Sequence, residues 1–84
     1  MAKIILERSY EPPIDEAQFG EMAQRIGSCL GANGATWLRS YLSADGRRSV
    51  CEFEAADAEK VRASFRAAGV AFERTWPAKV FASE

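Results

Sequence analysis

Apolar and polar residues alternate at the start of the chain, over residues 3–10, and Ile4 and Leu6 fall on the same side. A period of two is typical of a β-strand with one buried face. Two prolines follow and end the strand, because proline lacks the N–H group that a sheet needs. Asp15 then stands where it can cap a helix, and Gln18, three residues later, completes a capping box.

The helix that begins after Asp15 has one apolar stripe, whose members recur at intervals of three or four residues. They are Phe19, Met22, Ala23, Ile26, Cys29 and Leu30. Gly31 or Gly34 is expected to end the helix, since glycine readily adopts the positive φ found at helix C-termini. The pattern therefore predicts a long helix that buries one side.

A period of two returns at residues 35–42 and again at about residues 48–54, which predicts two further strands. The dipeptide Asp45-Gly46 lies between them. It predicts a hairpin with a type I′ turn, in which both central residues have positive φ. The two segments are therefore expected to be neighbouring antiparallel strands.

The expected turn fixes which residues of the two strands face each other. The resulting pairs are Trp37 with Glu54, Leu38 with Phe53, Arg39 with Glu52 and Ser40 with Cys51. Apolar residues thus meet apolar residues, and an arginine meets a glutamate. Trp37, Arg39 and Tyr41 are expected on one face of the sheet, and Leu38 is expected in the core.

A second helix is expected from its N-cap Asp57 to about Ala68, where Gly69 ends it. A short final strand is expected at residues 79–82, after Pro77. The order strand, helix, strand, strand, helix, strand predicts a ferredoxin-like βαββαβ domain of the α+β class. Residues 1–84 are expected to form this single domain, with two helices on one face of a four-stranded antiparallel sheet.

The other face of this sheet has no helix left to cover it. Its expected members are Ile5, Glu7, Trp37, Arg39, Tyr41, Val50, Glu52 and Glu54. This mixture is too aromatic for ordinary solvated surface and too charged for an interior. We therefore expect a partner sheet or a ligand to cover it. The candidate ligand-binding or interface residues are Trp37, Arg39, Tyr41, Glu52, Glu54 and Glu7.

Composition and charge narrow the function classes. The chain is 48% hydrophobic and 27% charged, as ordinary globular proteins are, and its net charge of −1 gives no attraction for nucleic acid or an anionic membrane. The apolar run at residues 4–6 is too short for a signal peptide or a membrane span, so we expect a cytoplasmic protein. Its two cysteines have no CxxC spacing and are expected to be buried apolar residues.

Three segments resemble one known family: residues 37–41 (WLRSY), 50–59 (VCEFEAADAE) and 76–78 (WPA). The chain is similar to the family called domain of unknown function 4242, which consists of small bacterial ferredoxin-like proteins. One member is described as a nickel-binding protein. The resemblance covers nearly the whole chain, and it implies the ferredoxin-like fold and dimerisation through the sheets.

The resemblance does not carry a nickel site onto this chain. Nickel-binding members have histidine near the end of the first strand and on the second helix, where this chain has Arg8-Ser9 and Ser64-Phe65-Arg66. The sequence contains no histidine at all, and imidazole is the commonest protein ligand for nickel. We therefore expect no metal site and no cofactor.

Acidic residues on the uncovered face allow two interpretations. Glu52 and Glu54 share one strand face, with Glu7 nearby, and such carboxylates can serve acid–base catalysis or bind a hard metal ion. They can also balance Arg39 and Arg8 across the sheet. We favour charge balance, because acid–base catalysis needs carboxylates in different environments and the sequence shows none.

Two function classes remain. The first is a small cytoplasmic dimeric binding module that holds a partner or a small ligand on its uncovered sheet face. The second is a cofactor-independent enzyme, oxygenase-like or cyclase-like, that uses the chamber of a dimeric α+β assembly. We favour the first, because such enzymes usually place a histidine or an isolated acid among apolar residues. The expected partner is a second copy of the chain, without nucleic acid or membrane.

Overall fold

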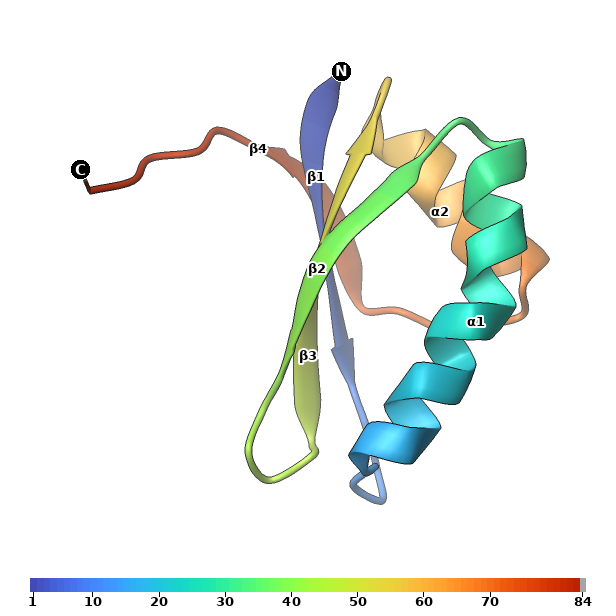
Figure 1. Cartoon of the computed structure of the whole chain (residues 1–84), viewed down its shortest axis with the longest axis vertical. Helices are drawn as coiled ribbons and strands as arrows, with labels where there is room; N and C mark the ends of the chain where they lie inside the picture. Colours follow the sequence, from blue (N-terminus) through green and yellow to red (C-terminus); the bar gives the residue numbers. More distant parts are fainter. Residues whose placement is uncertain (84) are drawn as a thin grey trace.

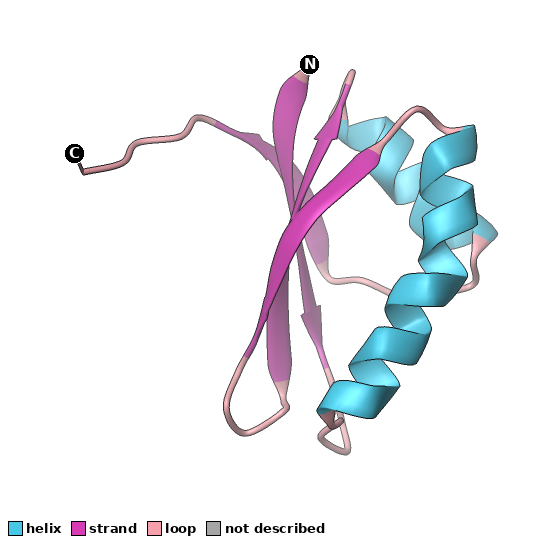
Figure 2. Ribbon diagram, in the orientation of Figure 1, coloured by secondary structure: helices cyan, strands magenta, loops and turns pink. Residues whose placement is uncertain are grey.

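Four strands of the protein form one antiparallel sheet, and two helices cover one of its faces (Figures 1 and 2). The computed structural model describes residues 1–83. Its elements are β1 (Ala2–Ser9), α1 (Glu16–Ala32), β2 (Thr36–Leu42), β3 (Arg48–Ala55), α2 (Ala58–Ala67) and β4 (Arg74–Ala78). The strands lie in the order β2-β3-β1-β4. The predicted ferredoxin-like βαββαβ fold is confirmed.

Both helices begin and end where the local chemistry predicts. The Asp15 carboxylate accepts a hydrogen bond from the Gln18 N–H, and the Gln18 side chain accepts one from the Asp15 N–H, which is the predicted capping box. Asp57 caps α2, and α1 ends before Gly34, whose φ is 68°. Within the part of the chain that the structure describes, neither helix is long and apolar enough to cross a membrane.

The core lies between the sheet and the two helices. Strand β1 contributes Ile4 and Leu6 to the core, and both are fully buried, as the alternating pattern predicts. Phe53 of β3 meets Phe65 of α2 edge to face, with ring centroids 5.8 Å apart, an arrangement that aromatic pairs favour. These contacts join β1, β3 and α2 at the centre of the domain.

The hairpin of β2 and β3 has the predicted register near its tip but a different turn. Arg39 lies opposite Glu52, as predicted. The Gly46 N–H donates to the Ser43 carbonyl at 2.9 Å, and of the turn residues Gly46 alone has a positive φ. A type I′ turn needs two such residues, so that prediction is wrong. The Ser43 hydroxyl instead donates to the Asp45 carboxylate, which stabilises another turn.

An irregularity in β2 moves Trp37 to the other face of the sheet. Trp37 lies opposite Phe53 and Arg39 lies opposite Glu52, so Leu38 between them has no partner in the pairing. An extra residue of this kind is a β-bulge, and it shifts the residues before it by one position. The predictions that Trp37 lies opposite Glu54 on the uncovered face and that Leu38 lies opposite Phe53 are therefore wrong.

The last strand lies earlier in the chain than the sequence predicts. It is β4, it contains Pro77, and it pairs with β1. Proline is tolerated there because an edge strand has a neighbour on one side only. Residues 79–82, predicted as the strand, have no regular structure and run away from the domain on the side opposite the helices (Figure 1). Val80 and Phe81 in this tail are 67% and 91% exposed.

Candidate functional site

The sheet face that carries no helix is the first candidate site, and we call it the open face. The strand register sets its side chains in rows that cross the sheet. One row is Arg39, Glu52, Ile5 and Trp76, and the next is Tyr41, Val50, Glu7 and Arg74. Lys3 and Glu54 lie on the open face beside the first row, and Ser9 and Arg48 lie on it beside the second.

Charged residues of the open face form pairs within the chain. The Oε1 atom of Glu52 lies 3.3 Å from Nε of Arg39. Glu7 accepts a hydrogen bond from Nε1 of Trp76 at 2.8 Å, and its carboxylate lies 3.4 Å from Nε of Arg74. The two glutamate side chains are 21% and 16% exposed, and their cationic partners compensate for this partial burial.

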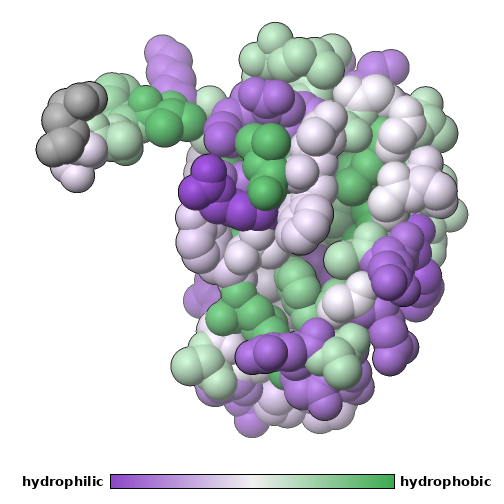
Figure 3. All heavy atoms as spheres, viewed as in Figure 1, coloured by the Kyte–Doolittle hydropathy of each residue, from purple (hydrophilic) through white to green (hydrophobic). Residues whose placement is uncertain are grey.

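Aromatic residues of the open face remain exposed between these charge pairs. Trp76 is 41% exposed and Tyr41 is 55% exposed. The tail, residues 79–82, borders a groove whose other wall includes Ile5, Trp76 and Glu52. In Figure 3 the tail stands clear of the body of the molecule and includes hydrophobic residues. Exposed aromatic residues beside charge pairs are typical of a surface that binds another molecule.

Five of the six predicted site residues share this face: Arg39, Tyr41, Glu52, Glu54 and Glu7. The sixth, Trp37, faces the helices instead. Sequence reasoning missed Trp76, because it placed the last strand after Pro77. The sequence Thr75-Trp76 could have indicated a strand before Pro77, since threonine and tryptophan both favour strands.

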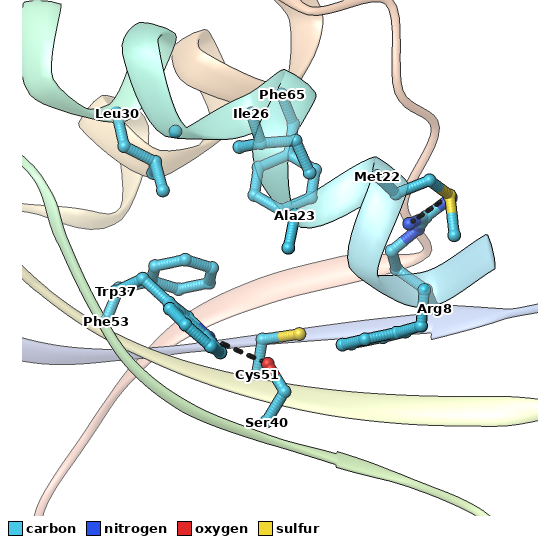
Figure 4. A pocket seen from close by; sticks show the side chains of 12 residues that line it. Arg8, Met22, Ala23, Ile26, Leu30, Trp37, Ser40, Cys51, Phe53 and Phe65 are labelled. Atoms are coloured by element: carbon cyan, nitrogen blue, oxygen red, sulfur yellow. Dashed lines mark hydrogen bonds between the residues drawn. The ribbon is translucent and has the colours of Figure 1, made fainter. Parts of the chain in front are cut away.

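A second candidate site is a pocket between α1 and strands β1, β2 and β3 (Figure 4). Its free volume is about 80 Å³. Most of its wall is apolar and includes Phe19, Met22, Ala23, Ile26, Phe53 and Phe65. Trp37 forms one end, where its Nε1 atom donates a hydrogen bond to the Ser40 hydroxyl at 2.8 Å. We call this space the helix-side pocket.

Three polar side chains reach the helix-side pocket, those of Arg8, Ser40 and Cys51. Burial raises the pKa of the Cys51 thiol, so the thiol stays protonated and a poor nucleophile near neutral pH. No carboxylate is among the described residues that line the pocket. The pocket thus suits binding better than acid–base chemistry.

Comparison with known proteins identifies the family. Residues 5–77 match the family described as nickel responsive protein SCO4226-like. The chain belongs to this family. The crystal structure of SCO4226 from Streptomyces coelicolor A3(2) matches with a TM-score of 0.87, over 96% of this chain and 100% of that one, at 15% sequence identity. At that identity the likeness shows the shared fold alone. No curated protein matches the sequence.

The donor groups of this SCO4226-like chain do not fit a nickel ion. Residues 1–83 contain no cluster of three side chains from histidine, cysteine, aspartate and glutamate that is able to hold a metal. Its free cysteines, Cys29 and Cys51, come from α1 and β3. Nickel favours imidazole, which this sequence lacks, whereas the remaining carboxylates suit harder cations.

Proposed function

We propose that this protein is a small cytoplasmic binding module that acts as a homodimer, with the open faces of two copies in contact. The observation that carries the proposal is the open face itself, where exposed aromatic residues lie between charge pairs on a sheet side without a helix. A domain this small gains stability when such a surface is covered. The charge of the open face and the exposed tail both favour a second copy of the chain as the molecule that covers it.

Charge on the open face is nearly balanced, which favours a self-complementary contact. Four cationic residues, Lys3, Arg39, Arg48 and Arg74, accompany three glutamates. In a two-fold dimer the same patch meets itself, so a patch of one sign would repel its copy. The open face largely avoids this repulsion, because both signs are interspersed on it and nearly cancel.

The tail supports the same arrangement through the area that it adds. The four strands contain 8, 7, 8 and 5 residues and present roughly 450 Å² of sheet, from the usual strand spacing and rise. A stable interface buries about 800 Å² of each partner. The tail carries exposed Val80 and Phe81 on the side of the open face and supplies part of the difference.

Binding fits this chain better than catalysis. Glu7 and Glu52, the least exposed acids of the open face, each lie beside an arginine. A general acid or base must be free to exchange a proton with the substrate, and a carboxylate held in an ion pair is poorly placed for this. We also propose that this chain does not bind nickel itself, although its family is described as nickel responsive.

Sedimentation equilibrium of the tag-free protein at micromolar concentrations tests the proposal. We expect twice the chain mass of 9.2 kDa. Phe81→Ser should weaken the association without changing the melting temperature of the monomer, because Phe81 is almost fully exposed within its own chain. A 9.2 kDa species at 100 µM would reject the dimer. In the same sample, a stoichiometric submicromolar nickel site in calorimetry would reject the statement on nickel.

A further inference from the structure

We propose that the helix-side pocket binds a small organic monoanion, namely a carboxylate attached to one compact apolar group such as a single aromatic ring. In this complex Arg8 binds the carboxylate and the apolar wall surrounds the remainder of the ligand. The site lies on the opposite side of the sheet from the open face. It therefore goes beyond the proposed self-association and does not depend on it.

Arg8 is the one charged side chain among the described residues that line the pocket. It continues the alternation of Ile4 and Leu6 along β1, which places it on the helix side of the sheet. None of the ion pairs formed within residues 1–83 includes Arg8. Partly buried charges are normally paired, so an anionic ligand supplies the charge that this pocket lacks.

The contacts of Arg8 hold its guanidinium in place and leave donors free. Its Nε atom donates to the Ala71 carbonyl at 2.8 Å, and its guanidinium carbon lies 4.9 Å from the centre of the Tyr10 ring. Its Nη1 atom donates to the Met22 sulfur at 3.2 Å, and a thioether is a weak acceptor. No hydrogen bond from Nη2 to a described residue accompanies these. The outer edge formed by Nη1 and Nη2 thus matches a carboxylate, which accepts two parallel hydrogen bonds.

Size and polarity of the pocket define the rest of the ligand. A cavity needs about 10–15 Å³ to hold one water, so the free volume of about 80 Å³ holds roughly five to eight water-sized atoms. A phenyl ring, with its six carbons, has this size. Phe19 and Ile26 from α1 and Trp37 from β2 give the wall its apolar character. A sugar or a nucleotide base would leave polar atoms unpaired there.

Titration of the ¹⁵N-labelled protein with benzoate tests this site, because the Trp37 indole signal reports on one end of the pocket. We expect the largest shifts at Trp37 and at amides of α1 and β3. Benzyl alcohol, which keeps the ring without the charge, and acetate, which keeps the charge without the ring, should each bind about tenfold more weakly or worse. Equal binding of benzoate and either analogue would overturn the proposal, as would shifts confined to the open face.

Two variants separate the carboxylate contact from the cavity. Arg8→Met should weaken benzoate binding at least about tenfold, whereas the control Arg25→Met should not. Arg25 is a fair control, because it also donates to a loop carbonyl, that of Ala68, but lies outside the pocket. Gly27→Leu fills the pocket from α1, where a new side chain meets open space. It should abolish binding while Arg8 is retained. Unchanged benzoate affinity in either Arg8→Met or Gly27→Leu would overturn the proposal.

Discussion

The Nε1 atom of Trp37 donates a hydrogen bond to the Ser40 hydroxyl three residues further along β2, and both side chains line the helix-side pocket. Trp76 occupies the opposite face of the sheet, where its own Nε1 atom bonds Glu7. The two tryptophans of the chain therefore report on different surfaces.

Replacing each tryptophan by alanine should give opposite results. Trp37→Ala should lower the free energy of unfolding by about 1.5–2.5 kcal/mol, half of the loss for a fully buried aromatic residue, and should leave association unchanged. Trp76→Ala should weaken association by about tenfold or more, as loss of an aromatic anchor does. Chemical denaturation and sedimentation equilibrium measure the two effects. Dissociation by Trp37→Ala alone would contradict the assignment of the two faces.

The sequence predicts most of this fold because several local signals agree. The capping box at Asp15, the cap at Asp57 and the fully buried pair Ile4 and Leu6 each have a distinct chemical signature. The sequence does not reveal the bulge at Leu38. Both Trp37 and Leu38 are apolar, so either one fits the helix side of the sheet and the alternating pattern cannot distinguish the two registers.

The edge of the sheet was harder to predict for a similar reason. Pro77 normally argues against a strand, yet at an edge its missing N–H costs no hydrogen bond on the solvent side. A last strand placed after Pro77 leaves Trp76 and Arg74 outside the sheet, so these two members of the open face were not predicted. The helix-side pocket was also hidden, since it depends on the side to which Trp37 turns.

Gly46 should be harder to replace than Gly69, another glycine with positive φ. The φ of Gly46 is 73°, and a Cβ atom there would overlap the carbonyl oxygen of Ile14. Gly69 has nearly the same φ of 70° but open space around it. Gly69→Ala should therefore cost about 1–2 kcal/mol, the strain of a left-handed residue. Gly46→Ala should cost at least about 1–3 kcal/mol more, as overpacking does. Urea denaturation measures both, and equal losses would show that Ile14 can yield.

The pair Arg39 and Glu52 should report whether the open face is covered. In the single chain the arginine side chain is 64% exposed, so a double-mutant cycle with alanine should give a coupling energy of only about 0.2–1 kcal/mol. In the dimer the same pair loses water and the coupling should increase. Cycles at nanomolar and at high micromolar protein concentration compare the two states. An identical coupling energy in demonstrated monomers and dimers would show that the pair stays solvated.

Stability should decline at alkaline pH through Cys51. Burial raises the pKa of this thiol in the folded protein above its ordinary value. As the pH passes the ordinary value, the unfolded chain releases the proton while the folded chain keeps it. The unfolded state is thereby favoured by up to about 1.4 kcal/mol per pH unit, until the pKa of the folded state is reached.

Unfolding free energies between pH 8 and pH 10.5 check this slope. Cys51→Ala should remove its share of the decline, and Cys29→Ala should keep it, because Cys51 is still present. Parallel pH profiles for the wild type and Cys51→Ala would contradict the prediction.

Two buried hydroxyl groups should respond oppositely to removal. The Thr75 Oγ1 atom is buried and has no hydrogen-bond partner among the described residues, whereas the Ser49 hydroxyl shares a hydrogen bond of 2.6 Å with Tyr10. Thr75→Val keeps the side-chain shape and removes an unpaired polar atom, so it should stabilise the protein by about 1 kcal/mol. Ser49→Ala leaves the Tyr10 hydroxyl without its partner and should cost about 1–3 kcal/mol. Thermal and urea denaturation at neutral pH measure both changes. A destabilised Thr75→Val variant would show that an ordered water binds this hydroxyl.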